Sequence, residues 1–348
     1  MKILLTKRRA LGDTVLLSST VAALKAALPA AEISVLVPRA FAPVLENNPA
    51  IARVLHFEAG WPSLVREIRN LKLDYLIQLH ASPRTRWLGW VAGAQASVFH
   101  VQNAEAAAHY QKQPNALEWD AFCLREIFGS KVSLPAPPPQ IFFTPDELAQ
   151  GKAYWQNFGA DPSRVVFLGL GASRITKRWP PAHFARLAEL LRDRHELIPA
   201  IITGPGEEEA RFAGLVIDEM RVRGFRPLGG PVGKGDFIHG ANLSVRRLAQ
   251  ALSACRAYIG NDSGPKHMAV AAGCPTLTLF GPEDPVEWHP YSREAHPVLF
   301  IEGLACRKED NGRWCGIPVC IEERHRCMVG LDPLEALAAF TRLKVPNA

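Results

Sequence analysis

Short apolar runs alternate with longer amphipathic segments along the first third of the chain. From Thr14 to Leu28 the apolar residues recur at the spacing of a helix, and shorter helical patterns follow near Phe41–Leu45 and over Ser63–Leu71. The apolar runs between them predict strands over residues 3–5, 33–37, 54–57 and 74–79. Strands that alternate with helices predict a parallel sheet whose two faces are covered by helices.

The same alternation begins again after a proline-rich stretch, Leu134–Pro139. Because such a stretch is stiff and forms helix poorly, it is suited to a domain boundary. A last helix, over 333–343, is expected to begin with Asp332 as its N-cap. The pattern predicts an α/β protein with two similar halves and a cleft between them, in which ligands bind at the carboxyl ends of the strands. The strands expected in this part are 165–170, 199–204, 257–260 and 276–282, and the helices are 181–192, 207–220, 244–255 and 268–273.

The turn Asp262–His267 joins one of these strands to a small-residue helix, and another strand follows. A turn of this kind leaves backbone N–H groups at a helix N-terminus, where the helix dipole favours an anion. Ser263 and Gly264 allow a ligand to approach the backbone, and the lysine and histidine that end the turn can add positive charge. The turn is therefore a candidate site for a nucleotide diphosphate. An ordinary turn with Asp262 or Ser263 as N-cap explains the same residues equally well.

Two loops carry further candidate chemistry. Asp13 follows the first strand and can act as a general base on a hydroxyl, although a helix N-cap explains it without any function. In the loop Gly169–Pro180, the hydroxyls of Ser173 and Thr176 and the ammonium of Lys177 suit phosphate oxygens. A solvated basic loop is the alternative interpretation of this second stretch.

The loops after two other strands give weaker signals. Glu207 follows a strand and can accept hydrogen bonds from ribose hydroxyls, but acidic charge in the first turn of a helix is favourable in itself. The proline-rich loop Phe280–Pro290 is suited either to one wall of a nucleotide pocket or to a rigid surface turn.

Composition and charge narrow the class of protein. The chain has 348 residues, of which 48% are hydrophobic and 21% charged, which predicts a packed protein of two domains. The net charge of +6 favours an anionic partner, but the basic residues form no long run, so nucleic acid is not expected. No apolar run approaches the roughly 18 residues of a membrane span, and the apolar start is too short for a signal peptide. A cytoplasmic location is therefore expected.

Four of the seven cysteines gather near the end of the chain. Four thiolates can hold a structural zinc ion, but zinc sites generally show closer pairs, and reduced cysteines in a loop-rich tail are the favoured interpretation. The four are Cys306, Cys315, Cys320 and Cys327.

Taken in order, these motifs resemble the lipopolysaccharide heptosyltransferases of glycosyltransferase family 9. The resemblance spans nearly the whole chain, including the tail that ends at Cys327-Met328. The element from Asp262 to His267 followed by Leu-Phe-Gly is fairly specific, whereas the Gly-Asp element is weak alone. The matching stretches are Leu11–Asp13, Gly171–Ser173, Lys177–Pro180, Asn261–Ala269 and Leu279–Pro282.

The resemblance implies a GT-B fold, with two Rossmann-like domains whose parallel sheets face a central cleft. The acceptor would bind to residues 1–140 and the sugar nucleotide to residues 141–330, and a C-terminal helix within 331–348 could pack back on the first domain. The implied reaction is the inverting transfer of a heptose from ADP-heptose to the inner core of lipopolysaccharide, with no required cofactor or metal. The basic surface would help the protein meet a phosphorylated acceptor as a peripheral protein of the inner membrane.

The resemblance also implies roles for individual residues. Asp13 matches the proposed base, and Gly12 beside it lies on the acceptor side. Lys177 would stabilise the leaving diphosphate together with the helix N-terminus at Ser263-Gly264. Asp262 would repel a diphosphate and is expected to hold a sugar hydroxyl or to cap the helix. The donor-binding set expected from the resemblance and the loop chemistry is Ser173, Thr176, Glu207, Asp262, Ser263, Gly264 and His267.

Other functions are weighed against this one. A transferase with another sugar nucleotide or surface-glycan acceptor is the nearest alternative. A non-catalytic, two-lobed protein that binds a nucleotide or sugar would not need the carboxylate of Asp13 opposite a phosphate loop. An NAD-dependent oxidoreductase is disfavoured because Arg174 stands where the third glycine of the dinucleotide motif would be.

Overall fold

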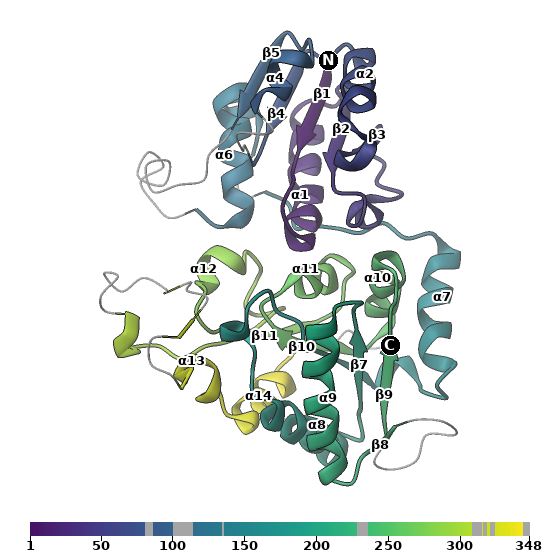
Figure 1. Ribbon diagram of the computed structural model, residues 1–348, viewed down its shortest axis with the longest axis vertical. Helices are drawn as coiled ribbons and strands as arrows, with labels where there is room; N and C mark the ends of the chain where they lie inside the picture. Colours follow the sequence, from purple (N-terminus) through teal and green to yellow (C-terminus); the bar gives the residue numbers. More distant parts are fainter. Residues whose placement is uncertain are drawn as a thin grey trace. The chain divides into compact units, whose positions relative to one another are not determined.

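The computed structural model of the protein (Figure 1) describes residues 1–80, 86–99, 114–133, 136–227, 236–307, 315, 319–320 and 324–343. The chain divides into two compact units, Met1–Phe142 and Phe143–Ala348. Each unit is built around one sheet of parallel strands, as the alternation of apolar runs and helices predicts. In the described ranges, no helix is both long and apolar enough to cross a membrane.

The first unit has a five-stranded sheet with the order β3-β2-β1-β4-β5. Its central strand, β1, pairs through Ile3 with Ile33 of β2 and with Tyr75 of β4. The strands are β1 (Lys2–Thr6), β2 (Glu32–Val37), β3 (Arg53–His56), β4 (Tyr75–Gln78) and β5 (Ala96–Phe99). The helices are α1 (Leu11–Ala27), α2 (Trp61–Leu71), α4 (Leu88–Val91) and α6 (Ala116–Phe128), with short 3-10 turns η1 (Ala42–Leu45), η2 (Phe57–Ala59) and η3 (Gly129–Lys131).

Helices cover both faces of this sheet because its strand residues are apolar on both sides. Leu4 and Leu36 belong to a core cluster with Leu64 of α2 and Leu88 of α4. Their neighbours along the strands, such as Leu5, point to the opposite face. There α1 packs against α6, and a buried ion pair lies between the two layers, as described below.

The second unit has a seven-stranded sheet with the order β12-β11-β10-β6-β7-β9-β8. The strands are β6 (Val165–Gly169), β7 (Ile198–Thr203), β8 (Arg226–Pro227), β9 (Asp236–Ala241), β10 (Ala257–Asn261), β11 (Thr276–Leu279) and β12 (Val298–Leu299). The helices are α7 (Pro145–Gln156), α8 (Pro181–His195), α9 (Glu207–Val222), α10 (Val245–Ala254), α11 (Gly264–Ala271), α12 (Pro285–Trp288), α13 (Arg326–Val329) and α14 (Pro333–Thr341), with 3-10 turns η4 (Pro162–Arg164), η5 (Ile175–Lys177) and η6 (Ala305–Arg307).

The main core of this unit lies between its sheet and the helices α8, α9 and α14, which Figure 1 shows side by side. Phe184, Val216 and Phe340 represent the three helices in that core. Asp332 accepts a hydrogen bond from the backbone N–H of Leu334, so the predicted N-cap of the last helix is confirmed. The buried face of α14 lies in the core of the second unit. That the C-terminal helix packs back on the first domain stays a prediction.

On the opposite side of the second sheet, α7 packs against α10, and α10 packs against α11. Gly151 permits the close approach of α7 and α10, since a Cβ atom there would lie 2.1 Å from the carbonyl oxygen of Gln250. Trp155 donates a hydrogen bond of 2.9 Å from Nε1 to the carbonyl oxygen of Ala251. Arg246 forms a two-pronged ion pair with Glu147, which joins the same two helices.

Candidate active site

The candidate donor residues gather at one edge of the second sheet. The strands β6, β7, β10 and β11 are neighbours or near neighbours and run parallel, so their carboxyl ends lie at the same edge. The loops that carry Lys177, Glu207, Asp262 and Glu283 each follow one of these ends. The topology therefore brings together the four loops that the sequence identified separately.

Two lysines hold the carboxylate of Asp262. Lys177 Nζ lies 2.6 Å from Asp262 Oδ2, and Lys266 Nζ lies 2.6 Å from Asp262 Oδ1. Lys266 also donates a hydrogen bond of 2.7 Å to the carbonyl oxygen of Trp288 and lies 4.9 Å from the centroid of the Phe280 ring. Lys266 is completely buried, whereas the Lys177 side chain is 11% exposed. Lys177 is thus the member of the pair that a ligand can reach.

The cluster carries a net positive charge. Burial alone would raise the pKa of Asp262, but the ammonium groups of Lys266 and Lys177 lower it well below its usual value, so the carboxylate is ionised. Burial lowers the pKa of Lys266 to about 8, a shift that its contact with Asp262 only partly opposes. At neutral pH two ammonium groups therefore share one carboxylate, which favours an anion nearby.

Asp262 does not cap the helix that follows, contrary to one of the expectations for it. The helix α11 begins at Gly264, and the N-cap position is held by Ser263, whose side chain makes no capping hydrogen bond. Both oxygens of Asp262 are directed to the lysines instead. The N-terminus of α11 thus lies next to Lys177 with no side chain capping it, which is the arrangement expected of a phosphate site.

His267 does not add positive charge to this turn, contrary to expectation. Its Nδ1 atom lies 2.5 Å from the hydroxyl of Tyr291, and the side chain is buried. Burial, followed by the positive charge of Lys266, lowers the pKa of His267 well below its usual value. The imidazole is therefore neutral at physiological pH, and its role in this structure is to tie α11 to the loop around Tyr291.

Asn261 fixes both ends of the loop that contains Lys177 and was not singled out from the sequence. Its Oδ1 atom accepts a hydrogen bond of 3.0 Å from the backbone N–H of Trp179, and its Nδ2 atom donates one of 2.8 Å to the carbonyl oxygen of Leu170. Arg174 forms an ion pair with Glu283 of the loop after β11. Both contacts hold the loop that contains Lys177. The sequence signal that could have identified Asn261 is its amide side chain at the end of an otherwise apolar strand.

The other predicted donor residues differ in how far their side chains are exposed. Ser173 is exposed in the loop after β6, whereas Thr176 is buried within η5. Glu207 is exposed at the start of α9, and the carboxylate that turns back to the strand ends is that of Glu209. Glu209 Oε1 accepts a hydrogen bond of 3.1 Å from the backbone N–H of Gly204 and faces Gly171. Glu208 also reaches the loop after β6, through an ion pair of 2.9 Å with Arg178, whereas Glu207 forms no contact of this kind that the structure describes.

Asp13 lies at the carboxyl edge of the sheet in the first unit. The helix α1 begins at Leu11, three residues earlier than expected, with Ala10 at the N-cap position. Asp13 is half-buried in the first turn of this helix, directly after the buried Gly12. The alternative interpretation of Asp13 as a helix N-cap is therefore wrong. A carboxylate in the first turn is nevertheless favoured by the helix dipole.

A buried polar cluster lies near Asp13. Lys7, the first of three consecutive basic residues, is buried and forms an ion pair with Asp120 of α6. Thr20 donates a hydrogen bond of 2.9 Å to the same carboxylate. Burial and then Lys7 lower the pKa of His80, while the negative charges of Asp13 and Asp120 oppose that shift. Asp13 is thus close enough to His80 for their charges to interact.

The cysteine-rich tail gives no support to a zinc site. All four of its cysteines are free thiols, and across the part of the chain that the structure describes no group of three or more His, Cys, Asp or Glu side chains could hold a metal ion. Cys255 and Cys274, which were not considered as a pair, lie with their sulfur atoms 3.6 Å apart in the interior of the second unit.

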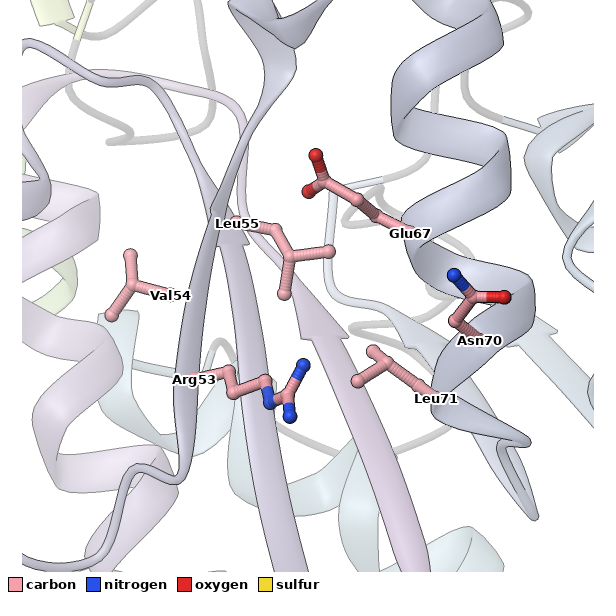
Figure 2. A pocket seen from close by; sticks show the side chains of 6 residues that line it. All are labelled: Arg53, Val54, Leu55, Glu67, Asn70 and Leu71. Atoms are coloured by element: carbon pink, nitrogen blue, oxygen red, sulfur yellow. The ribbon is translucent and has the colours of Figure 1, made fainter.

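A separate open pocket of about 350 Å³ lies between β3 and α2 of the first unit. Figure 2 shows Arg53 and Leu55 on the strand, and Glu67 and Asn70 on the helix. These residues come from β3 itself and the second half of α2, whereas Asp13 lies in α1, beyond the carboxyl end of β1. The pocket contains none of the candidate site residues.

Comparison with known proteins agrees with the fold. Lipopolysaccharide heptosyltransferase 1 of Pseudomonas aeruginosa is 24% identical over 308 residues, which cover 82% of this chain and 80% of that protein. Lipopolysaccharide heptosyltransferase 2 of Escherichia coli K12 is 25% identical over 370 residues, which cover 99% of this chain and 98% of that protein. The solved structure of ADP-heptose lipopolysaccharide heptosyltransferase II from E. coli has a TM-score of 0.73 and 22% identity, and covers 98% of both chains.

The structural likeness confirms the predicted α/β fold of the GT-B class, with its two parallel sheets. The sequence model of glycosyltransferase family 9, described as heptosyltransferase, matches residues 61–313, which include the loops of Lys177 and Asp262. The protein is therefore a glycosyltransferase, and the chain belongs to glycosyltransferase family 9, the heptosyltransferase family.

Proposed function

We propose that the protein transfers a heptose from ADP-heptose to the inner core of lipopolysaccharide with inversion at the anomeric carbon. The observation that carries the proposal is the placement of Lys177 beside the uncapped N-terminus of α11, held there by Asp262. A cation and a helix N-terminus at one point are suited to a diphosphate leaving group. The names of the family 9 relatives support heptose as the sugar and lipopolysaccharide as the acceptor.

The proposed reaction is a single displacement. The acceptor hydroxyl oxygen attacks the anomeric carbon and forms the new C–O bond, while the bond from that carbon to the diphosphate oxygen breaks. The electron pair of the broken bond stays on the diphosphate, where the charges of Lys177 and the α11 N-terminus stabilise it. The proton of the hydroxyl passes to the carboxylate of Asp13. Each step uses groups of this chain, so the proposal requires no metal or other cofactor.

The donor site would use the loops around β6, β7 and β10. The exposed Ser173 and the Lys177 ammonium are available to the phosphates, and Glu209 or Glu207 can accept hydrogen bonds from ribose hydroxyls. Asp262 acts through Lys177, since both of its oxygens are already paired with lysines. The acceptor is a lipid-borne, phosphorylated glycan in this proposal, which implies action at the cytoplasmic face of the inner membrane.

The test separates the base from the donor site. We expect Asp13→Ala to lower turnover of ADP-heptose by at least about a hundredfold, the range typical for loss of a general base, while ADP affinity measured by calorimetry stays unchanged. Lys177→Ala should weaken ADP binding, because it removes the exposed cation of the cluster. ADP affinity should also exceed that for UDP, GDP and NAD.

Near-normal turnover of Asp13→Ala would show that another group accepts the proton. A wild-type protein that prefers UDP or GDP would remain a transferase with a different donor. A protein that binds none of these nucleotides would remove the basis for the donor site.

A further inference from the structure

Exposed aromatic side chains gather on one side of the first unit. Trp90 is 92% exposed, and Trp61, Trp87 and Phe99 are between 37% and 47% exposed. They belong to α2, to α4 and its N-cap, and to β5. Large aromatic rings are costly to leave in water, and a contiguous group of them marks a surface that binds something.

Contacts between the rings show that they form one surface. The ring centroids of Trp61 and Trp87 lie 4.7 Å apart, so the start of α2 meets the start of α4. Trp90 follows Trp87 by three residues and therefore lies on the same side of the chain. The guanidinium of Arg86 lies 4.2 Å from the centroid of the Phe99 ring, which joins β5 to the group. We refer to Trp61, Arg86, Trp87, Trp90 and Phe99 as the aromatic surface.

The aromatic surface reaches the carboxyl edge of the sheet, where Asp13 lies. Trp61 begins the helix after β3 and η2, and Phe99 is the last residue of β5. In parallel strands these positions share one edge with the start of α1. Arg8 follows β1 at the same edge and lies 6.0 Å from the centroid of the Phe57 ring in η2, directly before α2. Exposed guanidinium groups thus accompany the aromatic rings toward the acceptor half of the proposed site.

We infer that the aromatic surface binds an anionic lipid bilayer. Tryptophan rings are favoured at the boundary between headgroups and acyl chains, where one part of the ring is apolar and the N–H is hydrated. Arginine near an anionic membrane gains about 1 kcal/mol of attraction, and its long stem can lie along the boundary. A protein partner would fit the rings alone, but the combination of rings with the exposed guanidinium groups of Arg8 and Arg86 on one edge matches an anionic surface.

The inference deepens the proposed function and rests on it, because a lipid-borne acceptor gives the enzyme a reason to meet the bilayer. Docking by this surface would bring the carboxyl edge of the first sheet, with Asp13, close to the headgroups that carry the acceptor. The peripheral membrane contact expected for the protein would then have a defined location.

The test measures co-sedimentation with phosphatidylcholine vesicles, with and without added phosphatidylglycerol. Wild-type protein should bind the anionic vesicles, and added salt should weaken the binding. The double variant Arg86→Gln/Trp90→Ser should bind at least tenfold more weakly. Loss of the charge alone is worth about fivefold, and the ring adds to it. Because Trp90 is almost fully exposed, its replacement leaves the core intact.

A matched control replaces an arginine and an exposed apolar residue of the second unit. Arg221→Gln/Val222→Ser changes the same charge at the end of α9, where Val222 is 86% exposed, and should bind vesicles as the wild type does. Equal binding of wild type and Arg86→Gln/Trp90→Ser would overturn the inference. So would a wild-type dimer in sedimentation velocity that the double variant converts to monomer, because the surface would then join two copies of the chain.

Failure of the inference and failure of the proposed function have different outcomes. If the surface binds membranes, Arg86→Gln/Trp90→Ser should slow heptose transfer to vesicle-borne acceptor but not to the deacylated, water-soluble oligosaccharide. If Arg86→Gln/Trp90→Ser transfers heptose to both acceptors at the wild-type rate and binds ADP normally, the membrane-binding role of the aromatic surface is refuted and the proposed transferase activity stands. Vesicle binding without any heptose transfer would refute the proposed reaction and leave the surface.

Discussion

The buried charge cluster makes a quantitative prediction about Lys266. Lys177 and Lys266 contact the two oxygens of Asp262 at 2.6 Å each, so removal of Lys266 leaves Lys177 as the single counter-ion of that carboxylate. In Lys266→Met the cluster becomes neutral, and Lys177 is held more firmly by Asp262. We therefore expect the variant to bind a nucleoside diphosphate more weakly, although Lys266 is buried away from any ligand.

The magnitude follows from the charges. Two ammonium groups on opposite oxygens of one carboxylate are about 5 Å apart, and at an effective dielectric constant of about 20 they repel by roughly 3 kcal/mol. In the wild type this repulsion favours transfer of Lys177 from Asp262 to a phosphate. If ligand binding relieves about half of this repulsion, the relief contributes about 1.4 kcal/mol to ADP binding, which corresponds to a factor of ten. Loss of Lys266 should then raise the dissociation constant for ADP about tenfold.

The assay is calorimetric titration of ADP into wild type and Lys266→Met, with thermal unfolding of both proteins as a check on folding. Methionine has a similar length and polarisable volume, so packing around Phe280 should be kept. An internal control comes from pH. The pKa of Lys266 is lowered to about 8, so a rise in pH through 8 should weaken ADP binding to wild type but not to Lys266→Met. Equal ADP affinities at pH 7 in two well-folded proteins would refute the coupling between the lysines.

Two further predictions concern the stability of the second unit. Gly260→Ala places a Cβ atom 2.4 Å from the carbonyl oxygen of Gly169 and should lower the free energy of unfolding in urea by about 2–3 kcal/mol, because it forces β10 away from β6. The control Gly206→Ala, whose Cβ atom would have no neighbour within 4 Å, should change the free energy of unfolding by less than about 1 kcal/mol. Equal effects of the two substitutions would refute the close approach of β10 and β6. Arg246 lowers the pKa of Glu147 to about 2, so their ion pair stabilises the fold fully above the ordinary value near 4.5, and its contribution is lost as pH falls from there through 2. After solvent screening this contribution is about 1 kcal/mol, and Arg246→Met should flatten the acid limb of the stability curve; an unchanged limb would show that the pair contributes nothing measurable.

Local patterns in the sequence determined most of the elements. Buried parallel strands are continuous apolar runs, so β1, β6 and β10 were located by composition alone. The last helix was located by Asp332 and Pro333, because a cap acts over only a few residues. Helix starts were less certain. α1 and α11 both begin earlier than their apolar periodicity, since the first turn of each contains glycine and polar or charged residues rather than a regular apolar pattern.

The pattern also predicted which loops lie together. Each candidate stretch follows a strand, and parallel strands end at a common edge whatever their order in the sheet. The proximity of Lys177 and Asp262, which are far apart in the chain, followed from that rule. The sequence could thus predict that these loops meet, but it did not distinguish Lys177 from Lys266 as the cation that a ligand can reach.

Only the tertiary structure decided the partners and the charge states. Lys7 begins a run of three basic residues, and its burial against Asp120 depends on α6 packing over α1. Glu209 rather than Glu207 faces the strand ends because the start of α9 sets which residues of its first turn point back. His267 is neutral because the fold buries it beside Lys266. Pairing and desolvation depend on which segments pack together, and periodicity along one chain carries no information about that.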